Sequence, residues 1–318
     1  MAARVVVHRI DEQGYRHDGL ESLDGGPLTG TVWIDITDPD VATFEQVSRL
    51  FPLPRLAMED CLHFPQRPKY DVYPDLTFVI WLAPQRPPDE GLKARELDVF
   101  LGEDHMVTVH RGGFDPLDRV AEHAAEYMAR GVEWTLHAIL DISVDDVFPL
   151  VDGIADELEQ LEDLMLENAR AEHLQRLFAA RRALVQLHKV VGPERDVVRG
   201  LARLEAFVEP DAYMYFQDVG DHLARAADSI ETYRDVANGT MDIYLSAQSN
   251  RMNQIMKQLT VIATIFMPLT LISGIYGMNV IKGMWPPVTE FWSFAAIVGV
   301  MLAIALWMLW FFRRREWW

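Results

Sequence analysis

The residues with the clearest chemical potential are Tyr276-Gly277-Met278-Asn279, which lie between two long apolar runs. Gly277 lets the backbone approach a ligand closely or leave helical geometry. Asn279 carries an uncharged amide, and copies of it around a common axis present a ring of carbonyl oxygens. Mg²⁺ prefers octahedral oxygen coordination and loses its water reluctantly, so such a ring can hold a hydrated ion by hydrogen bonds. The tetrapeptide therefore predicts an entrance site for a hydrated cation.

The apolar runs that flank this tetrapeptide are long enough to cross a membrane. No charged residue occurs from Gln258 to Ile281 or from Phe291 to Phe312. Each run exceeds the roughly 18 apolar residues that mark a membrane-spanning helix. The aromatic cluster Trp307–Phe312, followed directly by arginines, is typical of an interfacial belt with basic anchors. We therefore expect two C-terminal membrane helices.

The distribution of basic residues predicts how the two helices are oriented. Arg251 and Lys257 precede the first helix, and Arg313–Arg315 follow the second, whereas the connector carries only Lys282 and Glu290. The positive-inside rule then places both termini in the cytoplasm. The expected segments of this multi-pass protein of the plasma (inner) membrane are a cytosolic α/β domain (1–131), a cytosolic helical region (132–256), a first membrane helix (257–279), an external loop (280–290), a second membrane helix (291–312) and a basic tail (313–318).

The composition excludes several other classes. The chain has 29 Lys and Arg against 48 Asp and Glu, a formal charge of −19, which argues against nucleic acid and for cationic partners. Its one cysteine, Cys61, cannot form an internal disulfide, and a reducing compartment suits it. The sequence has no Walker, Gly-x-Gly-x-x-Gly, His-Glu-x-x-His or Cys-x-x-Cys motif, so we expect no enzymatic activity.

Short runs of β-branched and aromatic residues between turn formers predict strands in the first 131 residues. Helices are predicted over Thr43–Phe51, after Asp38-Pro39-Asp40, and from Asp115-Pro116 through Met128. The predicted strands are Val5–Val7, Thr31–Ile36, Leu76–Leu82, Leu97–Leu101 and Met106–His110. This pattern indicates a compact α/β domain.

From Trp134 the pattern is helical. Three-four spacing of apolar residues over Val147–Met165 predicts one arm of a helical hairpin, and Leu174–Val190 predicts the return helix. Gly192-Pro193 predicts a break. After Pro210 no proline occurs until Pro268, which predicts one very long helix that enters the membrane.

Aspartates recur every seven residues along that helix, which keeps them on one stripe. The heptad acids are Asp221, Asp228, Asp235 and Asp242, and the register continues through Ser249, Met256, Ala263, Thr270 and Gly277. The interleaved register is Asn253, Thr260, Met267 and Gly274. A solvated acidic face is the simpler interpretation. A ring of such helices from identical chains would instead line a cation-attracting path.

Taken together, the Gly-Met-Asn signature, the two C-terminal membrane helices, the long preceding helix and the stretch Asp242–Asn279 with "IATIFMPLT" resemble the CorA family of Mg²⁺ transporters. The resemblance implies an α+β fold with an N-terminal cytosolic α/β domain, a long helical stalk and two membrane helices, assembled as a funnel-shaped homopentamer. It also implies transport of Mg²⁺, with Co²⁺ or Ni²⁺ as further ions, under feedback from cytosolic Mg²⁺.

The resemblance assigns roles to particular residues. At the ion entrance it places Tyr276, Gly277, Met278 and Asn279. Along the pore it places Asn253, Met256, Leu259, Ala263, Met267 and Thr270, of which Met256 and Leu259 would form an apolar constriction. At a regulatory Mg²⁺ site between neighbouring chains it places Asp218, with Asp89 or Glu90 as the candidate partner and His222 as a possible further member.

Three alternatives stay open. A Zn²⁺ transporter of the same fold ranks lower because Met278 of the signature is retained. Relatives commonly carry an acid in the external loop soon after the signature, whereas this loop has Lys282 early and its only acid, Glu290, late, which leaves ion selectivity undetermined. A membrane-anchored cytosolic binding module explains the hairpin but not the small and polar register. A coiled-coil scaffold explains the heptads but not Asn279.

Overall fold

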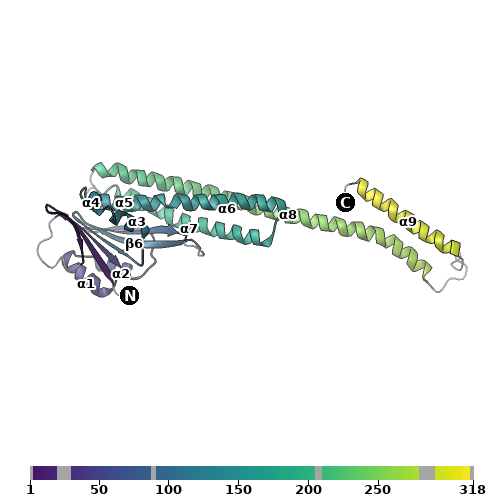
Figure 1. Cartoon of the computed structure of the whole chain (residues 1–318), viewed down its shortest axis with the longest axis horizontal. Helices are drawn as coiled ribbons and strands as arrows, with labels where there is room; N and C mark the ends of the chain where they lie inside the picture. The colour runs from purple at the N-terminus through teal and green to yellow at the C-terminus, as the bar shows by residue number, and fades with distance from the viewer. Residues whose placement is uncertain (1–2, 20–29, 87–90, 205–209, 279–290, 316–318) are drawn as a thin grey trace. The chain divides into compact units, whose positions relative to one another are not determined.

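The computed structural model describes residues 3–19, 30–86, 91–204, 210–278 and 291–315 (Figure 1). Internal contacts divide the chain into two units. The first unit comprises Met1–Leu164 with Arg170–Met241, and the second comprises Met165–Ala169 with Asp242–Trp318. Each unit is described by itself.

A seven-stranded sheet forms the core of the first unit, with the strand order β2-β1-β3-β7-β6-β5-β4. The strands are β1 (Arg4–Asp11), β2 (Gly14–Asp18), β3 (Thr31–Thr37), β4 (Lys69–Val72), β5 (Thr77–Gln85), β6 (Lys93–Leu101) and β7 (His105–His110). Strand β3 pairs with β7 in parallel, and the other described pairs are antiparallel. The five strands predicted from sequence correspond to β1, β3, β5, β6 and β7, whereas β2 and β4 were not predicted.

The two faces of the sheet follow from the alternation of side chains along each strand. In β3, Val32, Ile34 and Ile36 enter an apolar core that also contains Phe44 of α1 (Val41–Leu50). Cys61 of α2 (Arg55–Leu62) belongs to the same core, and Figure 1 shows both helices on that face. Helix α1 begins where Asp40 accepts a hydrogen bond from the Thr43 amide at 2.8 Å.

Helices cover the opposite face, where the alternating residues of β3 include Trp33 and Asp35. The remaining helices are α3 (Asp115–Ala121), α4 (Ala124–Met128), α5 (Val132–Asp145), α6 (Val147–Asn168), α7 (Ala171–Leu201), α8 (Pro210–Tyr276) and α9 (Phe291–Arg314). The single helix predicted from Asp115 through Met128 is wrong: it is two helices, because His123 leaves helical geometry with φ −121° and ψ 21°.

The predicted break at Gly192-Pro193 is also wrong, because α7 continues through Pro193 to Leu201. An interior proline costs about 3 kcal/mol through its missing N–H and its clash with the preceding turn. Buried Val191, Val197 and Val198 offset that cost by packing against the rest of the first unit. Glu194, also buried, accepts a hydrogen bond from the Leu82 amide of β5 at 3.1 Å and so fixes this turn to the sheet.

The predicted long helix is confirmed: α8 runs for 67 residues, from Pro210 to Tyr276, through Pro268. In α6 the predicted apolar arm is buried along its length, from Val147 and Val151 to Met165. Within the described residues, α8 and α9 are the two helices long and apolar enough to cross a membrane, and their most apolar windows are almost entirely unburied. A chain that exposes this much apolar surface needs a lipid or protein environment to cover it.

Candidate functional site

One side of α8 carries mainly small, hydroxyl and thioether side chains, together with Asn253 and Leu259, and we call these residues the α8 seam. The α8 seam comprises Asn253, Met256, Leu259, Thr260, Ala263, Met267, Thr270, Gly274 and Gly277, all of which are exposed. At about 100° per residue, the less exposed Val261, Ile265 and Ile272 lie on the opposite side of the helix. The contacts made within one chain therefore leave the seam uncovered.

Exposure does not by itself distinguish the seam, because Ile262, Phe266 and Leu271 outside it are also exposed. Every residue from Arg251 to Thr260 is exposed, so the exposure of Asn253, Met256 and Leu259 does not single out these three positions. Beyond Thr260, exposed and shielded residues alternate with helical spacing. Ala263, Thr270 and Gly277 of the heptad register and Met267 of the interleaved register all lie on one exposed side of α8.

Hydroxyl groups of the seam are arranged as hydrogen-bond acceptors. Thr260 Oγ1 donates to the Met256 carbonyl at 2.7 Å, and Thr270 Oγ1 donates to the Phe266 carbonyl at 2.8 Å. Because the hydroxyl proton is held by the helix, the oxygen lone pairs remain to accept from outside it. Water in the shell of a hydrated cation is such a donor, so these threonines can contact an ion without replacing its water.

The tetrapeptide at the end of α8 begins with a tight backbone turn. The Gly277 amide donates to the Ser273 carbonyl at 2.9 Å, and the Met278 amide donates to the Ile275 carbonyl at 3.3 Å. A Cβ atom on Gly277 would lie 3.0 Å from the Ser273 carbonyl oxygen, closer than ordinary side-chain contacts. This turn therefore favours glycine. Asn279, to which the entrance role was assigned, lies outside the described residues.

In the first unit, the predicted regulatory residue Asp218 lies in a cluster of acids and one imidazole. His222 Nε2 lies 3.5 Å from Asp218 Oδ2, and His222 Nδ1 lies 3.7 Å from Asp145 Oδ1. One ligand atom each from Asp141, Asp145 and His222 lie within 4.8 Å of one another, close enough to hold a metal ion. The structure thus places His222 beside Asp218 and adds Asp141 and Asp145 from α5.

Burial and charge make this cluster receptive to a cation. Partial burial is the main cause that raises the pKa of Asp141, and the carboxylates of Asp145 and Asp218 raise it further. Burial lowers the pKa of the neighbouring His137, so its imidazole tends to be neutral and offsets little of this negative charge. A bound dication would relieve the repulsion. Asp89 and Glu90, the expected partners of Asp218, lie outside the described residues.

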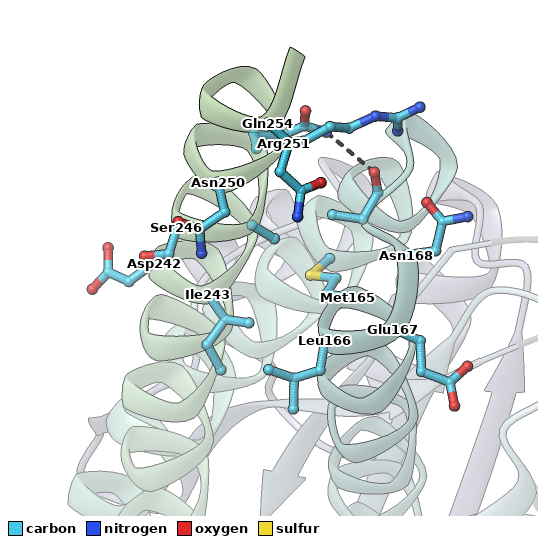
Figure 2. Close-up of a pocket in the computed structure, with 13 residues that line it drawn as sticks. Met165, Leu166, Glu167, Asn168, Asp242, Ile243, Ser246, Asn250, Arg251 and Gln254 are labelled. Atoms are coloured by element: carbon cyan, nitrogen blue, oxygen red, sulfur yellow. Dashed lines mark hydrogen bonds between the residues drawn. The ribbon is translucent and has the colours of Figure 1, made fainter. Parts of the chain in front are cut away.

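A pocket of about 620 Å³ lies in the second unit, between the end of α6 and the segment Asp242–Gln254 of α8 (Figure 2). Gln248 Nε2 donates to the Ala169 carbonyl at 3.1 Å and joins the two sides. In Figure 2 Asp242, the last heptad acid, projects away from Met165 and Leu166. The carboxylate of Asp242 therefore lies on a different side of α8 from the side that contacts the end of α6.

Three comparisons bear on identity. A family model described as CorA-like Mg²⁺ transporter protein matches residues 29–314. The chain is 34% identical over 294 residues to the cobalt/magnesium transport protein CorA of Thermotoga maritima, across 90% of this chain and 83% of that protein. The complete structure of the CorA magnesium transporter from Methanocaldococcus jannaschii matches with a TM-score of 0.85 over 100% of both chains, at 24% identity.

A zinc transporter is also among the relatives. The zinc transport protein ZntB of Photorhabdus laumondii is 26% identical over 180 residues, which is 56% of this chain and 54% of that protein.

The match to the Methanocaldococcus jannaschii structure confirms the predicted fold class, with an N-terminal α/β domain, a long helix and two apolar C-terminal helices.

Proposed function

The chain belongs to the CorA-like Mg²⁺ transporter family, and from that premise we propose that it conducts Mg²⁺ into the cytosol across the plasma membrane. In this proposal five copies assemble around an axis, and their α8 seams form the pore. Co²⁺ or Ni²⁺ are further ions, because the Thermotoga maritima relative is named as a cobalt/magnesium transport protein. The loop 280–290 lies outside the cell, both termini are cytosolic, and the membrane helices are 257–279 and 291–312.

The exposed seam is the observation that carries this proposal. A helix inside a bilayer gains nothing from exposing Thr260, Thr270 and Gly274 to lipid, whereas small and hydroxyl residues favour close packing of helices or contact with water. Met308 of α9 borders the seam at a groove of about 510 Å³. A neighbouring α8 suits this groove, which supports assembly through the seam side.

A role in ion transport is compatible with a sequence that lacks the Walker, Gly-x-Gly-x-x-Gly, His-Glu-x-x-His and Cys-x-x-Cys motifs. In a pore of this kind, a hydrated cation enters at Gly277-Met278-Asn279 and passes hydroxyl and carbonyl acceptors that replace few of its waters. It then crosses the apolar side chains of Met256 and Leu259, where passage depends on wetting of the constriction. The heptad acids Asp221 to Asp242 would raise the local cation concentration on the cytosolic side.

We propose further that cytosolic Mg²⁺ closes the pore by binding at Asp218. The Asp141–Asp145–His222 set beside Asp218 supports this role, because repulsion among its carboxylates is relieved by a dication. A ligand shifts a two-state equilibrium only through its different affinity for the two states, so the closed assembly must bind Mg²⁺ more tightly. Asp89 or Glu90 of a neighbouring copy is the proposed complement.

The direct test is ion uptake by purified protein in liposomes, with Mg²⁺, Co²⁺ and Zn²⁺ measured separately. We expect Mg²⁺ influx that follows the membrane potential and is absent from empty liposomes. Zinc transport is the second candidate, which the ZntB relative favours. Zn²⁺ uptake without Mg²⁺ uptake would establish that alternative, and uptake of none of the three ions would favour the anchored binding module or the coiled-coil scaffold.

A further inference from the structure

A second polar pocket, of about 570 Å³, lies in the first unit on the face of the sheet opposite α1 and α2. Strands β1, β2, β3 and β7 line it together with α3. Two histidines of its lining, His8 of β1 and His17 of β2, lie side by side as direct partners in the antiparallel register. None of the roles proposed above uses these residues.

The spacing of the two imidazoles is close to that of a chelating pair. Their ring centroids lie 6.3 Å apart, with the ring planes inclined by 25°. Two imidazoles bound to one tetrahedral ion through metal–nitrogen bonds of about 2 Å have centroids about 5 Å apart. Because the two rings are stacked, a chelate needs a rotation of one ring as well as a movement of about 1 Å. His17 is exposed and can make this movement by rotating its side chain, while the backbone register holds both residues in place.

His8 is held as a metal-ligating histidine is usually held. It is 6% exposed, and its ring stacks on Trp33 with a centroid distance of 4.5 Å. Its Nδ1 atom lies 2.7 Å from the Tyr15 hydroxyl. When Nδ1–H donates to the Tyr15 oxygen, Nε2 keeps a free lone pair, which is the arrangement that second-shell groups impose on metal ligands.

The third histidine of the pocket is already engaged. His110 Nδ1 lies 2.6 Å from the Gly112 carbonyl, which can only accept, and His110 Nε2 lies 3.3 Å from the Asp35 carboxylate. Both nitrogens therefore donate, and His110 offers no lone pair. Its contact with Asp35 raises the pKa of His110 against the effect of burial.

The other charged groups of the pocket nearly balance. Asp35, Asp118 and Glu122 supply carboxylates to its lining, and His110, whose two nitrogens both donate, is cationic. Arg4 lines it as well, and its positive charge reduces the attraction for a cation. Affinity must therefore come from the two imidazole nitrogens more than from net charge. Imidazole suits Zn²⁺, Ni²⁺ and related ions, whereas Mg²⁺ is held by oxygen ligands.

We propose that His8 and His17 form a binding site for a transition-metal dication of the Zn²⁺ class, with Tyr15 as the positioning residue that orients His8. The site discriminates by ligand chemistry and is selective against Mg²⁺. It lies in the first unit, uses none of the residues of the α8 seam or of the Asp218 cluster, and does not depend on the proposed transport function.

The test is calorimetric titration of Zn²⁺ into full-length, chelator-treated protein in detergent, with Mg²⁺ in large excess to occupy the oxygen-ligand sites. We expect a Zn²⁺ site that Mg²⁺ does not displace, distinct from any Zn²⁺ bound at His222. His17→Gln should weaken it at least about tenfold, and Tyr15→Phe about tenfold, since loss of a second-shell partner has that effect. His17 is exposed, so its replacement should leave the fold intact, and an unchanged Mg²⁺ titration verifies this.

His188→Gln is the matched control, because the His188 side chain is 48% exposed and lies outside this pocket. We expect it to bind Zn²⁺ as the unaltered chain does. Equal Zn²⁺ affinity in the unaltered chain and in His17→Gln would overturn the proposal. So would an equal loss in His188→Gln, or the absence of any Zn²⁺ site while Mg²⁺ is in excess.

Discussion

His222 Nε2 lies 3.5 Å from Asp218 Oδ2, one helical turn along α8. The other nitrogen of the same ring faces Asp145 of α5 at 3.7 Å, so one imidazole connects acids from two helices. Since a neutral imidazole offers only one N–H, it can donate to one of these carboxylates and not to both. Among the described residues Nδ1 of His222 has no hydrogen-bond partner, so it is available to a cation bound beside Asp145.

Replacing Asp218 should remove the response of the cytosolic part to Mg²⁺. We expect protease protection of the unaltered protein to rise with Mg²⁺ and that of Asp218→Lys to stay flat, because the lysine ammonium replaces part of the ion's charge. Uptake in liposomes should lose Mg²⁺ inhibition in the same variant. Limited proteolysis along a Mg²⁺ titration measures the first effect.

Asp228→Lys is the control for net charge, since Asp228 is an exposed heptad acid on the same helix outside the cluster. It should keep the rise in protection. If the unaltered protein shows no change in protection with Mg²⁺, feedback through this cluster is wrong.

Substitution at the outer end of α8 should abolish transport without preventing assembly. Gly277→Ala places a Cβ 3.0 Å from the Ser273 carbonyl oxygen and distorts the turn that leads into Asn279. We expect uptake to fall to the level of empty liposomes, with normal membrane insertion and oligomer size. Asn279→Ala should have the same effect by removing the amide.

Gly299→Ala in α9 is the matched control, because a Cβ there meets no atom within 4 Å in one chain. It should transport normally. Normal uptake by purified Gly277→Ala or Asn279→Ala would remove the entrance role from the tetrapeptide.

Helix α8 could be predicted from the sequence and strand β2 could not, and the difference has a physical cause. The long α8 and its seam are expressed in local periodicity, so they could be predicted from spacing alone. Strand β2 has the exposure pattern of an edge strand with no buried face, and its sequence Gly-Tyr-Arg-His-Asp shows no apolar alternation. Its pairing with β1 decides that it is a strand, and pairing is not a local property.

The same limit applies to the candidate sites. Asp218 was assigned through family resemblance, and His222 follows it by one turn. Asp141 and Asp145 are four residues apart on α5, a spacing that places both on one face, but nothing local to α5 indicates that α8 lies opposite. Pro193 shows the converse: a strong local signal for a break was overridden by burial of the residues around it.

The apolar side chains at the cytosolic end of the pore should act as a barrier to ions. Met256→Gly or Leu259→Gly should increase basal Mg²⁺ flux several-fold, because a wider and less apolar ring stays hydrated. Ile262→Gly is the control: it introduces the same backbone flexibility at an exposed apolar residue outside the seam. Flux through Met256→Gly and Leu259→Gly that matches the unaltered protein would place the constriction elsewhere.

Because the carboxyl group of Glu194 is buried, we predict that the contact between α7 and β5 weakens as pH rises. Burial raises the pKa of Glu194 well above its ordinary value, so the folded state binds a proton that the unfolded chain releases near pH 4.5. The contribution of Glu194 to the free energy of unfolding is therefore fully present below about pH 4.5. It falls by about 1.4 kcal/mol per pH unit as pH rises to the pKa of the folded state.

The exchange of the Leu82 amide hydrogen, corrected for its intrinsic rate, should accelerate up to about tenfold per pH unit in that window. Glu194→Gln should abolish the dependence and exposed Glu172→Gln should keep it; a pH-independent Leu82 amide in the unaltered chain would refute the assignment.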